Sequence, residues 1–208
     1  MSASGRERTF NERQIASTNK QMGEPAYKIV AVDRFEEPGF TELAESVFRD
    51  ADRRERALLD LHEAERETAD RAPERGAFGP TLRLGAYSGN ELVGWTFGWF
   101  QRGRGFYMAN SAVLPEFRRR SVYSSLVKAT IESTARDGAI SVRSRHVAGN
   151  NAVLIAKLKL GFHITGSEYS EELGLLIRLC YVISDERRKL FVERAGSAGG
   201  FEMVQPEV

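Results

Sequence analysis

Hydrophobic residues along this chain recur with two periods, and each switch of period marks an expected element. Spacings of three and four residues predict helices, and alternating residues predict strands. Between residues 27 and 75 the pattern gives a short strand at 27–32 and two helices, the second mostly charged and placed within 49–75. From residue 82 it gives a hairpin that turns at Ser88-Gly89-Asn90, and then a further strand at 106–113.

In the second half of the chain, strands alternate with helices. Pro115 ends the strand at 106–113, and a helix is expected from about Arg118 to a C-cap at Asp137-Gly138. The remaining expected elements are a strand at 140–147, a helix from Asn150 or Asn151 to Leu160 that Gly161 ends, strands at 162–168 and 175–183, and a short helix from Asp185. This order predicts an α/β fold, with a mixed central sheet of about six to seven strands and helices on both faces.

Alternation also places Val93, Trp95, Phe97 and Trp99 on one face of the hairpin's second strand. Large aromatic side chains on a strand are more often part of a core than of an acceptor pocket, but both interpretations remain open. Gly94 and Gly98 lie between them, where another part of the chain or a ligand approaches closely.

Composition predicts one globular domain at residues 26–195, because 41% of the 208 residues are hydrophobic and 28% are charged. Residues 1–25 are expected to form a disordered N-terminal tail, and residues 196–208 a flexible C-terminal tail. The single cysteine, Cys180, cannot form an internal disulfide, and no segment resembles a signal peptide or a membrane span. A cytoplasmic protein is therefore expected.

The net charge of +1, from 30 basic and 29 acidic residues, gives no general attraction to polyanions. Neither nucleic acid nor a membrane is expected as a partner. The three histidines and one cysteine show no metal-ligand spacing, so no metal site is expected. A monomer or a homodimer fits the sequence equally well.

The clearest candidate chemistry lies where the strand ending at Val113 gives way to a helix. The intervening loop places unpaired backbone N–H groups at the positive end of a helix dipole, a geometry that binds phosphate. The three adjacent arginines Arg118, Arg119 and Arg120 would reinforce the binding of a polyphosphate. Taken alone, such a run is usually only the solvated start of a helix.

This loop resembles the acetyl-CoA pyrophosphate loop of the GCN5-related N-acetyltransferases (the GNAT family), which reads Arg/Gln-x-x-Gly-x-Gly/Ala after Val-x-Pro. Val113, Pro115 and Arg118 match, whereas Ser121 and Tyr123 replace the two usual glycines. Residues 150–162 resemble the family's next signature, an asparagine, a short helix and Lys-x-Gly-Phe entering a strand. Both motifs occur in order, and the resemblance covers roughly residues 82–184.

The resemblance implies an N-acetyltransferase that uses acetyl-CoA, or another acyl-CoA. It would transfer the acetyl group to a primary amine of a small molecule or protein, by direct attack in a ternary complex. In the family, a splayed strand holds the pantetheine arm and the loop holds the pyrophosphate. The positions that correspond here are Ala112, Val113, Leu114, Arg118, Arg119, Arg120, Ser121, Val122, Tyr123, Ser124 and Asn150.

The side chains that would move protons depart from the family's pattern. Tyr107 stands where some members place a glutamate base, and Lys157 stands where many place a tyrosine acid. Tyr123, one turn into the helix, is the candidate substitute for that acid. His146 is a candidate base because an ordinary histidine titrates near neutrality, although packing or a structural hydrogen bond is the more common role of such a residue.

Two other classes of function compete with the enzyme. A non-catalytic acyl-CoA-binding or regulatory module on the same scaffold is favoured by the missing glutamate and tyrosine. A nucleic-acid-facing protein that uses Arg118–Arg120 is disfavoured by the balanced net charge. The acceptor pocket is expected from residues 36–80 and the final hairpin, but the sequence does not identify the acceptor.

Overall fold

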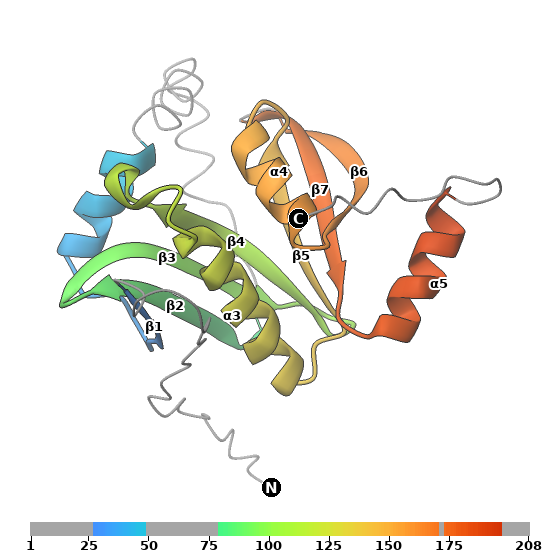
Figure 1. Cartoon of the computed structure of the whole chain (residues 1–208), viewed down its shortest axis with the longest axis horizontal. Coiled ribbons are helices and arrows are strands. Elements are labelled where there is room, and N and C mark those ends of the chain that lie inside the picture. Colours follow the sequence, from blue (N-terminus) through green and yellow to red (C-terminus); the bar gives the residue numbers. More distant parts are fainter. Residues whose placement is uncertain (1–26, 49–78, 171–172, 197–208) are drawn as a thin grey trace, which may run out of the picture.

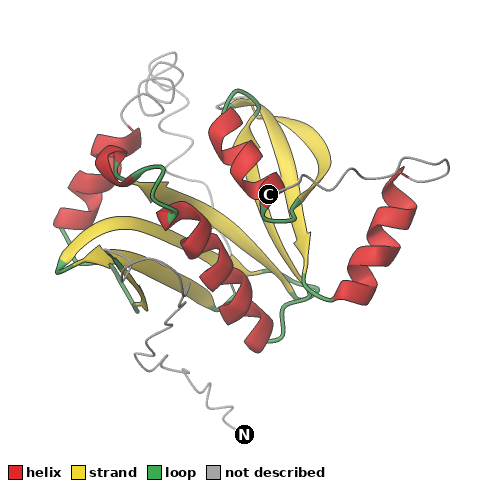
Figure 2. Ribbon diagram, in the orientation of Figure 1, coloured by secondary structure: helices red, strands yellow, loops and turns green. Residues whose placement is uncertain are grey.

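The computed structural model describes residues 27–48, 79–170 and 173–196 of the chain. Within these ranges seven strands form one mixed sheet in the order β1-β2-β3-β4-β5-β7-β6 (Figures 1 and 2). The strands are β1 (Lys28–Ala31), β2 (Thr81–Ser88), β3 (Glu91–Phe100), β4 (Gly105–Val113), β5 (Ser141–Val147), β6 (His163–Ser170) and β7 (Gly174–Val182). The helical elements are a helix at residues 39–48, the short 3-10 helix η1 (Pro115–Phe117), α3 (Val122–Arg136), α4 (Asn151–Lys159) and α5 (Asp185–Gly196). The predicted α/β fold is confirmed.

Strands β1 to β4 form an antiparallel meander. Gly89, with a φ of 60°, closes the predicted turn between β2 and β3. The close approach expected at Gly98 is also present, because a Cβ there would collide with the backbone of Tyr107 on β4.

Helices cover both faces of the sheet, as predicted. On one face, to the front of Figure 1, lie α3 and α4; α3 buries Val122, Leu126 and Ala129 in the main core. The helix at residues 39–48 packs on the opposite face, where the ring of Phe40 meets the fully buried Trp95 at 5.4 Å in an edge contact. That face therefore has a second, smaller core of its own.

The prediction that Val93 shares a face with Trp95 is wrong. The register of β2 against β3 passes from Leu92 directly to Gly94, so Val93 is the extra residue of a β-bulge. The bulge turns Val93 into the main core, whereas Trp95 packs in the second core. A bulge shifts the alternation by one residue, and hydrophobicity alone does not reveal it.

Helix α3 begins at Val122 rather than at about Arg118. The intervening residues form η1 and a loop in which Arg119 and Ser121 have φ values of 61° and 62°. Left-handed residues cannot continue an α-helix, so they delay its start. Asp137 and Gly138 end α3 as predicted, and Gly161 follows α4 with a φ of 87°.

Several predictions fall outside the described residues. They are the tails at 1–25 and 196–208, apart from Gly196 at the end of α5, and the second helix within 49–75. In the part of the chain that is described, no helix combines the length and apolar character needed to cross a membrane.

Candidate active site

Strands β4 and β5 separate partway along their length. They pair in parallel only where Gly105–Tyr107 lies beside Ser141–Arg143. Beyond that point β4 stays paired with β3, and β5 stays paired with β7. Figure 1 shows the two strands diverging from their shared end. Residues 108–113 and 144–147 therefore present strand edges that, within the described part of the chain, have no partner strand on the facing side, which is the splay that the family resemblance implies.

Some of the backbone groups at the end of β4 already form hydrogen bonds within the protein. The N–H of Leu114 donates to the carbonyl of Val93 at 3.0 Å, so it faces β3. Because successive residues of a strand point their backbone groups to opposite sides, the N–H and C=O of Val113 face the gap. The Arg118 Nε donates to that carbonyl at 3.2 Å. Among these groups, the Val113 N–H is therefore the one that faces the gap without a hydrogen bond to the described residues.

The loop before α3 has the geometry of an anion site. Ser121 is the N-cap of α3 in the left-handed conformation, and its side chain makes no capping hydrogen bond. The first bond of the helix joins the Ser125 N–H to the Ser121 carbonyl at 2.9 Å, so the N–H groups of residues 121–124 lack intrahelical acceptors. The helix dipole adds positive potential at the same place. Ser121 thus adopts the backbone conformation that the family's glycine usually supplies.

The three loop arginines have different surroundings. Arg118 braces the end of β4 through Val113, and the guanidinium of Arg120 lies 5.5 Å from the ring centre of Phe117. Arg119 is exposed and makes no hydrogen bond or ion pair with the described residues. Arg119 is therefore the arginine of this run that is freest to meet a phosphate.

Tyr123 and Asn150, two of the predicted site residues, differ in the hydrogen bonds that their side chains make. The hydroxyl of Tyr123 is buried and lacks a well-formed hydrogen bond to the described residues. Burial raises the pKa of Tyr123 to about 12, and the nearby Ser111 side chain offsets part of that rise. The Asn150 side chain accepts a hydrogen bond from the Val153 N–H at 3.4 Å, which confirms the predicted cap of α4. Two polar atoms therefore remain available to a ligand, the Tyr123 hydroxyl and the amide nitrogen of Asn150, because neither makes a well-formed hydrogen bond to the described residues.

A lysine occupies the point where the strands part. The ammonium of Lys157, from α4, donates to the hydroxyl of Ser144 at 2.8 Å and to the sulfur of Met108 at 3.3 Å. Met108 and Ser144 are the residues that directly follow the last parallel pair of β4 and β5. Lys157 is fully buried, and no carboxylate of the described residues forms an ion pair with it. Burial lowers the pKa of Lys157 to about 7.

In the sequence, Lys157 stands out only as the residue that replaces the family's tyrosine. Its position carried a further signal, since Lys157 lies three residues after Leu154 and three before Leu160, both of which pack against the main core. A lysine within the apolar stripe of a short helix is seldom fully buried without a reason.

His146 and Tyr107 both approach this point, from different sides. The His146 Nε2 lies 3.0 Å from the Ser144 hydroxyl. Burial, and secondly the charge of Lys157, lower the pKa of His146 to about 3, so the expected neutral-range titration is absent. The Tyr107 hydroxyl accepts a hydrogen bond from Arg145 at 2.9 Å. Both candidate bases therefore already have structural partners.

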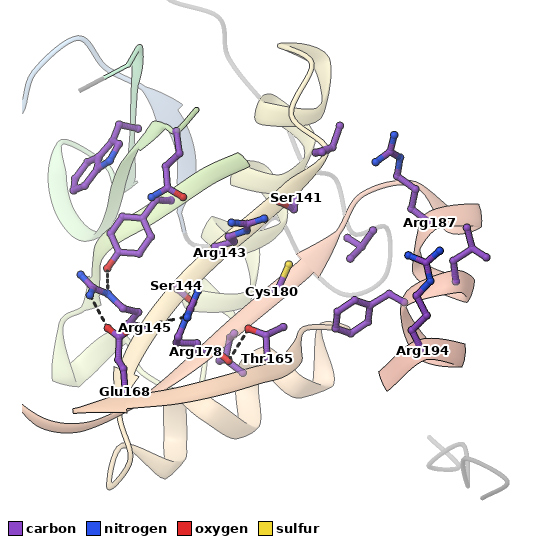
Figure 3. A pocket seen from close by; sticks show the side chains of 18 residues that line it. Ser141, Arg143, Ser144, Arg145, Thr165, Glu168, Arg178, Cys180, Arg187 and Arg194 are labelled. Atoms are coloured by element: carbon purple, nitrogen blue, oxygen red, sulfur yellow. Dashed lines mark hydrogen bonds and ion pairs between the residues drawn. The ribbon is translucent and has the colours of Figure 1, made fainter. Parts of the chain in front are cut away.

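A hollow of about 1180 Å³ lies on the face opposite α3 and α4, between the sheet and α5 (Figure 3). Tyr107 and Arg143, the last parallel pair, line it together with Ser144. The hollow therefore reaches the point where β4 and β5 part. The predicted acceptor pocket included the final hairpin, which contributes here, and residues 36–80, most of which lie outside the described residues.

The arrangement fits a long donor that carries a pyrophosphate at one end. The loop supplies N–H groups for the phosphates, and the parted strands supply a backbone edge. The orphan hydroxyl of Tyr123, in the first turn of α3, lies near Ser111 on the edge of β4. A buried cation at the far end can stabilise developing negative charge.

Comparison with known proteins agrees with this geometry. The sequence model of the acetyltransferase (GNAT) family matches residues 39–162, which is more than half of the chain. No curated protein sequence matches the chain.

Several solved structures share the fold. Ard1 from Thermoplasma volcanium is 19% identical, with a TM-score of 0.54 over 77% of this chain and 99% of its own. The ribosomal-protein-S18-alanine N-acetyltransferase from Escherichia coli is 16% identical, with a TM-score of 0.52 over 84% and 99%. A Bacillus subtilis acetyltransferase in complex with CoA is 18% identical, with a TM-score of 0.53 over 76% and 99%. Because the family's sequence model matches more than half of this chain, the chain belongs to the GNAT family of acetyltransferases.

Proposed function

We propose that this chain is an N-acetyltransferase that moves an acetyl group from acetyl-CoA to a primary amine, by direct attack in a ternary complex. The observation that carries the proposal is the position of Lys157, buried where β4 and β5 part, at the far end of the gap from the anion-binding loop. Acetyl-CoA would supply the acyl group as a thioester. The solved relative that holds CoA supports an acyl-CoA as donor.

Donor binding would rest mainly on the backbone. The N–H groups of residues 121–124 would receive the pyrophosphate, with Arg119 as the free neighbouring cation. The Val113 N–H would hold the arm that runs between the strands. Backbone groups fixed by the sheet need no reorganisation to bind, and they hold the two reactants in position.

Lys157 would act on the leaving sulfur. Its Nζ holds a proton that it can donate as the thiolate departs, and its charge would stabilise that thiolate before transfer. A pKa of about 7 suits this task, because a proton on such a group is released more readily than one on an ordinary lysine. The Ser144 hydroxyl accepts from the ammonium and fixes its direction, and His146, whose Nε2 lies 3.0 Å from the same hydroxyl, is uncharged and adds no competing positive charge.

The acceptor amine must lose a proton when its nitrogen bonds to the acyl carbon. His146, with a pKa of about 3, is too weak a base for this at neutral pH. The Tyr107 hydroxyl is held by Arg145. Water reaching the reaction point through the open hollow is the acceptor of that proton in this proposal.

Two measurements test the proposed function. Calorimetry with desulfo-CoA, which cannot react, tests donor binding alone. Initial rates of thiol release, with acetyl-CoA and amine both varied, should give intersecting double-reciprocal lines, as a ternary complex requires. Binding of desulfo-CoA without thiol release from any amine would instead support the non-catalytic acyl-CoA-binding module, and parallel lines would contradict direct attack.

A further inference from the structure

The hollow between the sheet and α5 is unusually rich in arginine. Five arginines line it, three from the floor of the sheet and two from α5: Arg143, Arg145, Arg178, Arg187 and Arg194. Figure 3 shows the two α5 arginines across the hollow from the arginines of β5 and β7. Glu168 is the single acidic residue in the described lining. Five arginines and one glutamate give the described lining a formal net charge of +4.

Glu168 neutralises only part of this charge. One of its oxygens lies 2.6 Å from Arg145, and the other lies 3.8 Å from Arg178. Arg145 and Arg178 are direct cross-strand partners, an arrangement that places like charges opposite each other and costs stability. Glu168 bridges that pair. It does not reach the remaining three arginines.

The other three arginines have no acidic partner within the described chain. Neither Arg187 nor Arg194, both on exposed positions of α5, forms an ion pair there. Arg143 is exposed, and its neighbour in the floor is the thiol of Cys180. Guanidinium groups that converge on one hollow, and that have no carboxylate partner among the described residues, form a site suited to carboxylate or phosphate oxygens.

The location of the charge relates it to acetyl transfer. Arg143 belongs to the last parallel pair of β4 and β5, and Ser144, which follows it, binds the ammonium of Lys157. A molecule seated on the arginines would thus have its far end at the point where the strands part. On α5, Leu190 and Phe191 give the same hollow an apolar wall for a short hydrocarbon segment.

We propose that this hollow binds the acyl acceptor, and that the acceptor is a small amine bearing one or more anionic groups, carboxylate or phosphate. This inference rests on the proposed function, because it names the substrate class of the same site. Like-charge repulsion from the arginines would at the same time select against polyamines and other polycationic amines.

The test compares amines that differ in one group. Thiol release from acetyl-CoA is measured with an alkylamine, the amino acid of the same chain length, the corresponding aminoalkyl phosphate, and a linear polyamine. We expect at least one anionic member to have a kcat/KM roughly 100-fold above the alkylamine, and the carboxylate and phosphate arms decide which oxyanion is preferred. Added NaCl should lower that preference, because screening weakens charge recognition.

Substitution of single arginines tests whether the hollow is the source of the preference for anionic amines. Arg143→Gln and Arg187→Gln should each raise the KM for the preferred anionic amine roughly 10-fold while leaving the dissociation constant of desulfo-CoA within 2-fold. Arg136→Gln, at an exposed position of α3 outside the hollow, is the matched control and should change neither value. Equal kcat/KM for neutral and anionic amines in the wild type would overturn the inference, even if a variant failed to fold.

Failure of acetyl transfer can be distinguished from failure of the anion site. If no amine releases thiol, calorimetry of each amine against the protein saturated with desulfo-CoA still tests the hollow. Binding of an anionic amine that Arg143→Gln weakens would support the anion site without acetyl transfer. Absence of binding by every anionic amine would overturn the site itself.

Discussion

The Lys157 ammonium donates a 2.8 Å hydrogen bond to the Ser144 hydroxyl, at the first residue of β5 beyond its pairing with β4. A buried ammonium without a carboxylate is costly, because leaving water disfavours the charged form. Proteins retain such groups where the chemistry needs them. The pair therefore marks the point of the fold where we place the leaving group.

Replacing Lys157 with methionine should separate activity from stability. We expect kcat for acetyl transfer to fall by about 100-fold, the effect typical of losing a general acid. The dissociation constant of acetyl-CoA should change little, because the loop and strand edges remain. Steady-state kinetics and calorimetry measure the two quantities.

Lys159→Met is the matched control, since Lys159 is exposed two residues along α4. It should retain wild-type kcat. If the two variants lost activity equally, the loss would reflect charge on α4 rather than a proton at the strand gap.

The depressed pKa of Lys157 predicts how stability depends on pH. Between about pH 7 and the ordinary lysine value of 10.5, the unfolded chain binds this proton and the folded chain does not. The free energy of unfolding from this group therefore rises with pH across that window, by at most about 1.4 kcal/mol per pH unit. Urea denaturation of wild type and Lys157→Met at pH 6, 7, 8 and 9 measures the difference.

In the same series, we expect Lys157→Met to be the more stable protein at pH 6, with an advantage that shrinks toward pH 9. Titrations shared by both proteins, such as the raised pKa values of Cys180 and Tyr123, cancel in this comparison. A pH-independent difference would show that Lys157 keeps its proton throughout.

Substitutions at Ser121 test whether the backbone geometry of the loop, rather than its charge, binds the phosphate. The Ser121 φ of 62° strains a serine but suits glycine, so Ser121→Gly should raise the free energy of unfolding by about 1 kcal/mol and preserve donor affinity. Ser121→Pro cannot adopt that φ and removes an N–H, so it should weaken acetyl-CoA binding far more than Arg119→Ala does. Equal losses in Ser121→Pro and Arg119→Ala, by calorimetry, would mean that charge rather than geometry dominates.

Tyr123→Phe distinguishes the two candidate acids. Its buried hydroxyl lacks a well-formed partner, and removing such a group should raise the free energy of unfolding by about 1 kcal/mol. If Lys157 supplies the proton, kcat should stay within a few-fold of wild type. A loss as large as that of Lys157→Met would instead assign the acid role to Tyr123, as its position in the sequence first indicated.

Much of the fold was predictable because local signals agree with the tertiary structure. The turn at Gly89 and the caps at Asn150 and Gly161 each have a specific backbone requirement that the residue type reveals. The late start of α3 and the bulge at Val93 were not predictable, because both depend on backbone conformations that serine, arginine and valine rarely signal.

The candidate site likewise contains one part that the sequence predicts and another part that it does not. The anion-binding loop follows from a short stretch of consecutive residues, so the sequence indicates it. Lys157, Ser144 and Met108 come from a helix and two strands, and only packing brings them together. The low pKa of His146 likewise depends on burial and on the charge of Lys157, neither of which the spacing of residues reveals.

The proposed transfer of an acetyl group from acetyl-CoA to an amine can be measured through its two products. The most direct measurement incubates the protein with acetyl-CoA and a panel of neutral and anionic amines, and quantifies both free thiol and N-acetylated amine by mass spectrometry. We expect equal amounts of the two products with at least one amine, and a large loss of both in Lys157→Met but not in Lys159→Met. Thiol release without any acetylated amine, or no reaction with any amine while desulfo-CoA binds, would contradict it.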